Sequence, residues 1–82
     1  MFKELSRSIR NYAKEQSTDS VKRYYNDIAD ALDNEEFLQT LSNTETLERL
    51  KYLQNNFNYG ISGTSNFNDA LNTVYINYAT YR

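Results

Sequence analysis

The stretch Ser17–Leu32, with the sequence STDSVKRYYNDIADAL, has the clearest helical period in the chain. Its apolar residues recur at steps of three and four, which is the spacing of one face of an α-helix. These residues are Val21, Tyr24, Tyr25, Ile28, Ala31 and Leu32. Because no other segment has so clear a period, we expect the remaining helices to pack against this one.

A second helix is predicted before this stretch, from about Phe2 to Gln16. It combines an apolar stripe with a parallel stripe of four cations at helical spacing, Lys3, Arg7, Arg10 and Lys14. The residues of segment 17–20 favour caps and turns, so we expect a break there, with Ser17 or Thr18 capping the next helix. No Gly or Pro forbids a continuous helix through this segment.

Two shorter helices are predicted between residues 33 and 57. Asp33 and Glu36 have the spacing of a capping box and would begin the first, which carries Phe37, Leu38 and Leu41. Asn43 or Thr44 would cap the second. Its expected inward residues are Leu47, Leu50, Leu53, Gln54 and Phe57.

The C-terminal segment predicts a loop followed by a last helix. Gly60 suits the end of the preceding helix, because glycine tolerates a positive φ, and residues 60–65 read as a loop without a basic residue. The last helix begins at Ser65 or Asn66. Its apolar stripe contains Phe67, Ala70, Leu71, Val74, Tyr75, Tyr78 and Tyr81, and Ile76 falls outside it.

These patterns predict an all-α fold, a compact bundle of four to five short helices in a single domain over residues 1–82. Helix 17–32 and the last helix should supply most of the core. The predicted core residues are Leu5, Ile9, Tyr24, Ile28, Leu32, Leu41, Leu50, Phe57, Leu71 and Val74. Without a membrane span or a secretory signal pattern, we expect a cytoplasmic protein.

The composition argues against an enzyme. The chain contains no His and no Cys, so the common nucleophile arrangements and zinc ligands are missing. Asp27, Asp30 and Asp33 form a row at helical spacing that could bind a cation or act in acid–base catalysis. A solvated helix face is the more ordinary explanation, so we expect no catalytic residue, no metal and no cofactor.

The charges are separated along the chain. Residues 1–26 carry a net charge of +3, residues 27–48 carry −7 without a single base, and residues 49–82 carry +2. Two explanations compete for the acidic segment 27–48. It pairs with the Lys3–Lys14 stripe inside the protein, or it meets a basic surface on another protein and steers association.

The preferred hypothesis is a non-enzymatic inhibitor that binds a protein partner with a basic surface, such as a nuclease complex. Small acidic phage or mobile-element proteins that block bacterial defence nucleases (the anti-CRISPR type) share this physical character. The expected contact residues are Tyr24, Asp27, Asp30, Glu35, Glu36, Glu45, Glu48, Tyr52 and Tyr59. We expect no direct contact with nucleic acid, given a pI near 5.0. A homodimer is compatible with the sequence.

The alternative is a helical bacteriocin-immunity type protein, a small cytoplasmic bundle that protects a producer cell. Its size and helical pattern are compatible with this chain. In that case the functional residues would lie in the C-terminal half, at Tyr75, Tyr78 and Tyr81.

Overall fold

The computed structural model describes residues 2–41, 44–56 and 65–81, and it is helical with no strand in these ranges. The helices are α1 (Lys3–Lys14), α2 (Asp19–Asp33), α3 (Glu35–Thr40), α4 (Thr44–Asn56) and α5 (Ser65–Tyr81). The predicted all-α bundle is therefore confirmed, and the last helix begins at one of its two predicted positions. The expected loop at residues 60–65 lies outside the described residues, apart from Ser65.

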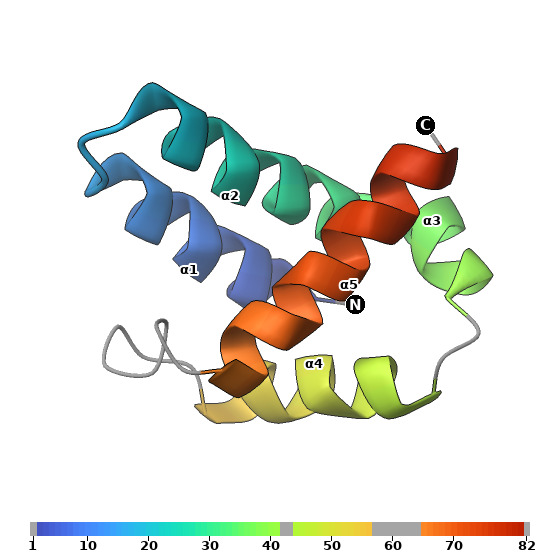
Figure 1. Cartoon of the computed structure of the whole chain (residues 1–82). Coiled ribbons are helices and arrows are strands. Elements are labelled where there is room, and N and C mark those ends of the chain that lie inside the picture. Colours follow the sequence, from blue (N-terminus) through green and yellow to red (C-terminus); the bar gives the residue numbers. More distant parts are fainter. Residues whose placement is uncertain (1, 42–43, 57–64, 82) are drawn as a thin grey trace.

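The five helices form one compact unit around α2 (Figure 1). Helices α1 and α2 lie side by side and antiparallel, and α5 crosses over α2 to reach α4. Helix α4 also contacts α1, and the short α3 packs against the end of α2. Helices α1, α3 and α5 thus pack against α2, as its pattern predicts, whereas α4 packs on α5 and α1 instead.

The break between α1 and α2 falls in the polar segment that predicts it. Thr18 occupies the N-cap position of α2 in an extended conformation, and its carbonyl accepts the backbone N–H of Lys22 at 3.0 Å. The Thr18 side chain, however, makes no capping hydrogen bond. The position of the break is confirmed, but the expected side-chain cap at its N-cap residue is not made.

The predicted capping box at Asp33 and Glu36 is wrong by one residue. Asp33 is the last residue of α2, and Asn34 is the N-cap of α3. The Asn34 side chain accepts a hydrogen bond from the backbone N–H of Phe37 at 3.2 Å. Asp33 is instead bonded to side chains of α1. Asn34 therefore adopts the extended conformation and caps α3.

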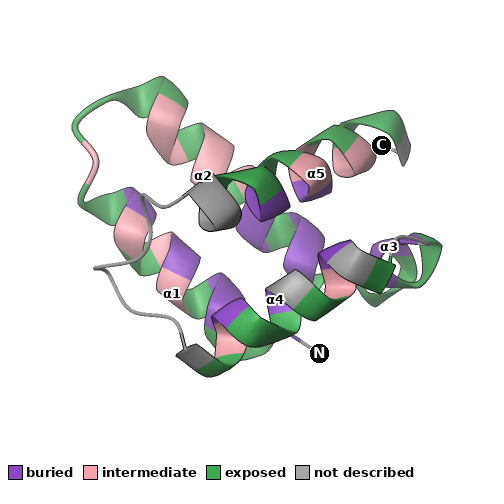
Figure 2. Cartoon of the chain, turned by 60° about the horizontal axis from the view of Figure 1, so that its bottom comes forward, coloured by how far each residue is buried: buried purple, intermediate pink, exposed green. Residues whose placement is uncertain are grey.

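The core is apolar and draws on every helix (Figure 2). Eight of the predicted core residues are buried: Leu5, Ile9, Ile28, Leu32, Leu41, Leu50, Leu71 and Val74. Tyr24 is half-buried and packs against the core from its edge, and the side chain of Phe57 lies outside the described residues.

The N-terminal helix contributes more to the core than expected. Phe2, Leu5 and Ile9 are fully buried, and Ala13 joins them one turn further on. Since α1 packs along most of α2, the expectation that α2 and α5 supply most of the core was too narrow. Ile76, outside the predicted stripe of α5, is 62% exposed as expected.

A row of four tyrosine rings joins α1, α2 and α5 at the edge of the core. Tyr12 lies 5.0 Å from Tyr25 between ring centroids, Tyr25 lies 5.2 Å from Tyr24, and Tyr24 lies 5.0 Å from Tyr75. The Tyr24 hydroxyl also donates a hydrogen bond to Asn72 Oδ1 on α5. The half-buried tyrosine rings therefore lie in the packing between helices, and the hydroxyl of Tyr24 reaches a polar partner.

None of the helices, over the part of the chain that is described, is long and apolar enough to cross a membrane.

Candidate functional site

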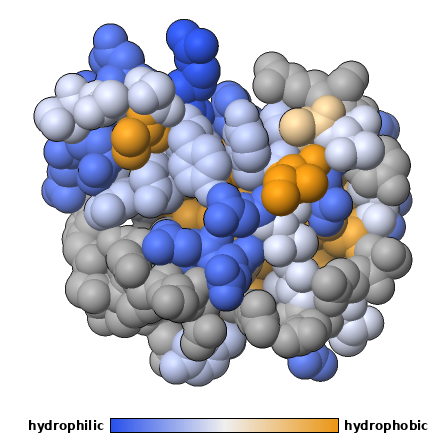
Figure 3. Space-filling model, in the orientation of Figure 1, coloured by the Kyte–Doolittle hydropathy of each residue, from blue (hydrophilic) through white to orange (hydrophobic). Residues whose placement is uncertain are grey.

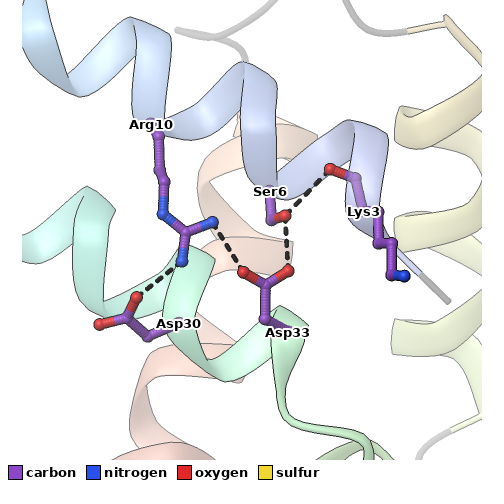
Figure 4. Close-up of polar contacts among 5 residues, drawn as sticks. All are labelled: Lys3, Ser6, Arg10, Asp30 and Asp33. Atoms are coloured by element: carbon purple, nitrogen blue, oxygen red, sulfur yellow. Dashed lines mark hydrogen bonds and ion pairs between the residues drawn. The ribbon is translucent and has the colours of Figure 1, made fainter.

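Arg10 on α1 binds two carboxylates of α2 at once (Figure 4). Its Nη2 lies 2.7 Å from Asp30 Oδ1, and its Nη1 lies 2.8 Å from Asp33 Oδ2. The two aspartates are three residues apart, so both project from the same face of α2 toward α1. One guanidinium therefore ties the middle of α1 to the C-terminal turn of α2.

Ser6 completes this cluster from within the fold. Its hydroxyl lies 2.7 Å from Asp33 Oδ1 and 3.0 Å from the main-chain carbonyl of Lys3, and the residue is 2% exposed. A hydroxyl carries one proton, and the charged acceptor at the shorter distance binds it more strongly. Each oxygen of the Asp33 carboxylate thus has a donor from α1.

The cluster stabilises a charge that its position in the helix disfavours. Asp33 ends α2, where the helix dipole is unfavourable to an anion. Burial raises the pKa of Asp33, but the hydrogen bonds from Ser6 and Arg10 and the Arg10 charge outweigh it and leave the pKa lowered. Burial lowers the pKa of Arg10, and its bonds with Asp30 and Asp33 outweigh this and leave the pKa raised.

A polar groove of about 550 Å³ follows the line between α1 and α2. It is lined by Lys3, Ser6, Arg7, Arg10, Asn11, Lys14, Asn26, Leu32, Asp33 and Glu35. All four cations of the predicted stripe line it, but only Arg10 has an ion pair with a described residue. The other three, Lys3, Arg7 and Lys14, are exposed.

The carboxylates of the acidic segment 27–48 differ in their ion pairing and exposure. Asp30 and Asp33 are paired with Arg10, which confirms the intramolecular explanation for these two carboxylates. Glu35, Glu36 and Glu48 are exposed and have no ion pair with any residue described, and Asp27 is half-exposed. We call Glu35, Glu36 and Glu48 the acidic end, because α3 and the start of α4 lie at the same end of the bundle (Figure 1).

A smaller hollow of about 300 Å³ lies between α3 and α4. It is lined by Glu35, Leu38, Gln39 and Leu47. Glu35 lines both this hollow and the groove, so the acidic end adjoins the groove at this residue.

The tyrosines among the predicted contact residues have different environments. Tyr24 is engaged in ring packing and in its bond to Asn72, and its pKa is raised by burial and by the neighbouring Tyr75. Tyr52 is 65% exposed on α4, one turn after Glu48. Tyr59 and the side chain of Glu45 lie outside the described residues.

The residues that an immunity function would use are part of the packing where they are described. Tyr75 contacts Tyr24, and the Tyr78 ring lies 5.6 Å from that of Phe37 in an edge-to-face arrangement. Substituting either tyrosine would therefore disturb contacts between helices. The side chain of Tyr81 lies outside the described residues.

Two functional features could not be named from the sequence. The helical spacing of Asp30 and Asp33 predicts a shared face, but only the packing of α1 on α2 selects Arg10 from four similar cations. Ser6 carried no signal beyond its place beside the apolar stripe of α1. Within the described residues, no cluster of three or more potential ligands could hold a metal ion.

The surface shown in Figure 3 is mostly hydrophilic, with hydrophobic residues in a few separate spots. The chain is thus a small all-α bundle with three neighbouring surface features. These are the charge cluster around Arg10, the groove between α1 and α2, and the acidic end. Comparison of the chain with protein-family models, with characterised proteins and with solved structures finds no match.

Proposed function

We propose that this chain is a non-enzymatic inhibitor that binds a protein partner through its acidic end. The partner has a basic surface, such as the nucleic-acid groove of a bacterial defence nuclease, and the inhibitor acts by occupying it. A phage or mobile-element protein of the anti-CRISPR type would act in this way.

One observation carries the proposal. Arg10 pairs with both Asp30 and Asp33, whereas Glu35, Glu36 and Glu48 are exposed and have no ion pair with a described residue. Glu4, Glu15 and Asp69 are also exposed without an ion pair to a described residue, but Glu35, Glu36 and Glu48 lie on α3 and the start of α4, at one end of the bundle. These three are therefore the candidates for contact with another molecule.

The physical effect of such a surface is on association more than on the final affinity. Several like charges on one end create a field that attracts a basic groove and raises the rate of encounter by about 10- to 1000-fold at low salt. Because exposed pairs contribute only about 0.2–1 kcal/mol each, the three glutamates act together and lose their effect as salt screens them. Tyr52, exposed one turn from Glu48, can supply an amphipathic contact beside the charges.

The test compares two variants with the same change in charge. Glu35→Gln/Glu36→Gln/Glu48→Gln removes the acidic end, and Glu4→Gln/Glu15→Gln/Asp69→Asn removes three exposed carboxylates elsewhere. Tagged wild type and both variants are used to capture proteins from a bacterial lysate at low salt, followed by elution at high salt. Far-UV circular dichroism checks that both variants keep their helices.

We expect one basic, nucleic-acid-binding protein to be retained by the wild type and the control variant and lost by the acidic-end variant. A competing DNA duplex should displace the inhibitor from that protein, because both occupy the same surface. Retention by the acidic-end variant, or equal loss from both variants, would contradict the proposal.

A further inference from the structure

The groove between α1 and α2 has two ends of different charge. Because the helices are antiparallel, Asp33 lies opposite Ser6 and Asp30 opposite Arg10. Asn26 lies one turn further along α2, toward Lys14. Of the carboxylates that line the groove, Glu35 therefore lies toward Lys3, and Asp33 lies between the levels of Ser6 and Arg10.

Lys14, Asn11 and Asn26 line the other end, and Arg7 extends this set toward the middle of the groove, level with Asp33. Arg7, Asn11 and Lys14 are spaced by four and three residues, which places them on one edge of α1, and Asn26 lies opposite Lys14 on α2. None of these four side chains has a hydrogen bond or an ion pair with a described residue. They present N–H donors to the groove, and Arg10 beside them is fixed by its two aspartates.

We propose that Arg7, Asn11, Lys14 and Asn26 bind a small anion with two linked phosphoryl groups, the chemistry of pyrophosphate. Arginine binds phosphate oxygens in pairs through its planar fork, lysine binds them as a point charge, and amide N–H groups complete the oxygens' hydrogen bonds. Arg7 and Lys14 are about 10 Å apart along the helix at a rise of 1.5 Å per residue. A linked pair of phosphoryl groups can contact both cations across this span, with Asn11 between them on α1 and Asn26 opposite Lys14 on α2.

The lining of the groove favours this ligand over an acidic peptide or a long nucleic acid. Leu32 is the one residue with an apolar side chain among those that line the groove in the described part of the chain, and the others carry charged, amide or hydroxyl groups. Glu35 and the Arg10-paired Asp33 place carboxylates along the Lys3 half of the groove, and the chain as a whole carries a net charge of −2. A long polyanion would meet both sources of repulsion, whereas a short one can stay among Arg7, Asn11, Lys14 and Asn26.

This site is independent of the acidic end, since its donors lie on α1 and α2 and the proposed protein contact lies on α3 and α4. Either can fail without the other.

Isothermal titration calorimetry of the full chain with inorganic pyrophosphate, at low salt and in a buffer without phosphate, tests the proposal. Arg7→Gln/Lys14→Gln removes both cations of the site, and the matched control Arg23→Gln/Lys51→Gln removes one exposed arginine and one exposed lysine elsewhere. We expect saturable binding to the wild type and the control. The groove variant should lose about tenfold or more in affinity, because two charge-assisted hydrogen-bond partners are removed.

A third variant distinguishes a site with specific hydrogen-bond donors from non-specific electrostatic attraction. Asn26→Ala leaves the charge unchanged and should still weaken pyrophosphate binding by a few-fold. Citrate, a single phosphate and a single-stranded oligonucleotide are titrated in parallel. Absence of binding at millimolar pyrophosphate, equal losses in the two double variants, or citrate or the oligonucleotide binding as tightly as pyrophosphate would each overturn the proposal.

Discussion

Replacing Arg10 with glutamine should cost about 1–2 kcal/mol of folding free energy at neutral pH. The change removes ion pairs to Asp30 and Asp33, and the side chains involved are 35%, 57% and 40% exposed, so each pair falls in the range of about 0.2–1 kcal/mol for partly exposed pairs. The two carboxylates then face the C-terminal dipole of α2 without a counter-charge, which adds a few tenths of a kcal/mol.

Urea unfolding followed by far-UV circular dichroism measures this loss, in a buffer without phosphate. In a chain of this size, the expected cost lowers the melting temperature by about 4–8 °C for each kcal/mol. Arg7→Gln is the matched control, because Arg7 is an exposed arginine one turn away with no described ion pair, and its cost should stay within about 0.5 kcal/mol. A double-mutant cycle with Asp33→Asn isolates the coupling within the cluster.

The loss should also depend on pH in a defined direction. The folded-state pKa of Asp33 is lowered, so its contribution is present above its unfolded pKa of about 3.9 and disappears as the pH falls through the lower folded value. The stability difference between wild type and Arg10→Gln should therefore shrink at low pH. Equal stability of Arg10→Gln and Arg7→Gln at neutral pH, or a difference that persists unchanged in acid, would refute this reasoning.

Three further changes test the packing and the caps, each by urea unfolding. Ile28→Val removes one buried methyl group at the centre of the bundle and should cost about 0.5–1.5 kcal/mol, so a neutral result would contradict the packing. Tyr24→Phe keeps the ring contacts but removes the bond to Asn72, for an expected cost of about 0.5–1 kcal/mol that disappears in an Asn72→Ala background. Asn34→Ala should cost about 0.5–2 kcal/mol and Thr18→Ala much less, because only Asn34 makes a side-chain cap; equal costs would argue against this difference.

The periodic parts of the chain were predictable, and the exceptions have local causes. The stripes around Leu5, Ile28 and Leu71 predict buried faces because helical spacing and apolarity agree there, and these residues are buried. The cap of α3 was misplaced because Asp33 and Asn34 are both good N-cap residues. Only the tertiary contact of Asp33 with Ser6 and Arg10 decides between them.

The candidate site was less predictable, because it depends on how helices face each other. The sequence shows that cations and carboxylates are separated, but not which of them meet. Arg10 pairs with Asp30 and Asp33. Arg7 and Lys14 therefore line the groove, and Glu35 and Glu36 form part of the acidic end, without an ion pair to a described residue. This division follows from the antiparallel packing of α1 and α2, which no single segment encodes.

The tyrosine row gives the protein a built-in optical reporter. The chain has eight tyrosines and no tryptophan, so its near-ultraviolet signals come from tyrosine with a minor phenylalanine contribution. Four of these rings touch in series across α1, α2 and α5, where a chiral, fixed environment should give a near-ultraviolet circular dichroism band. Loss of that band with the far-ultraviolet signal retained would reveal helices that persist after their packing has loosened, a distinction that can be followed without any label.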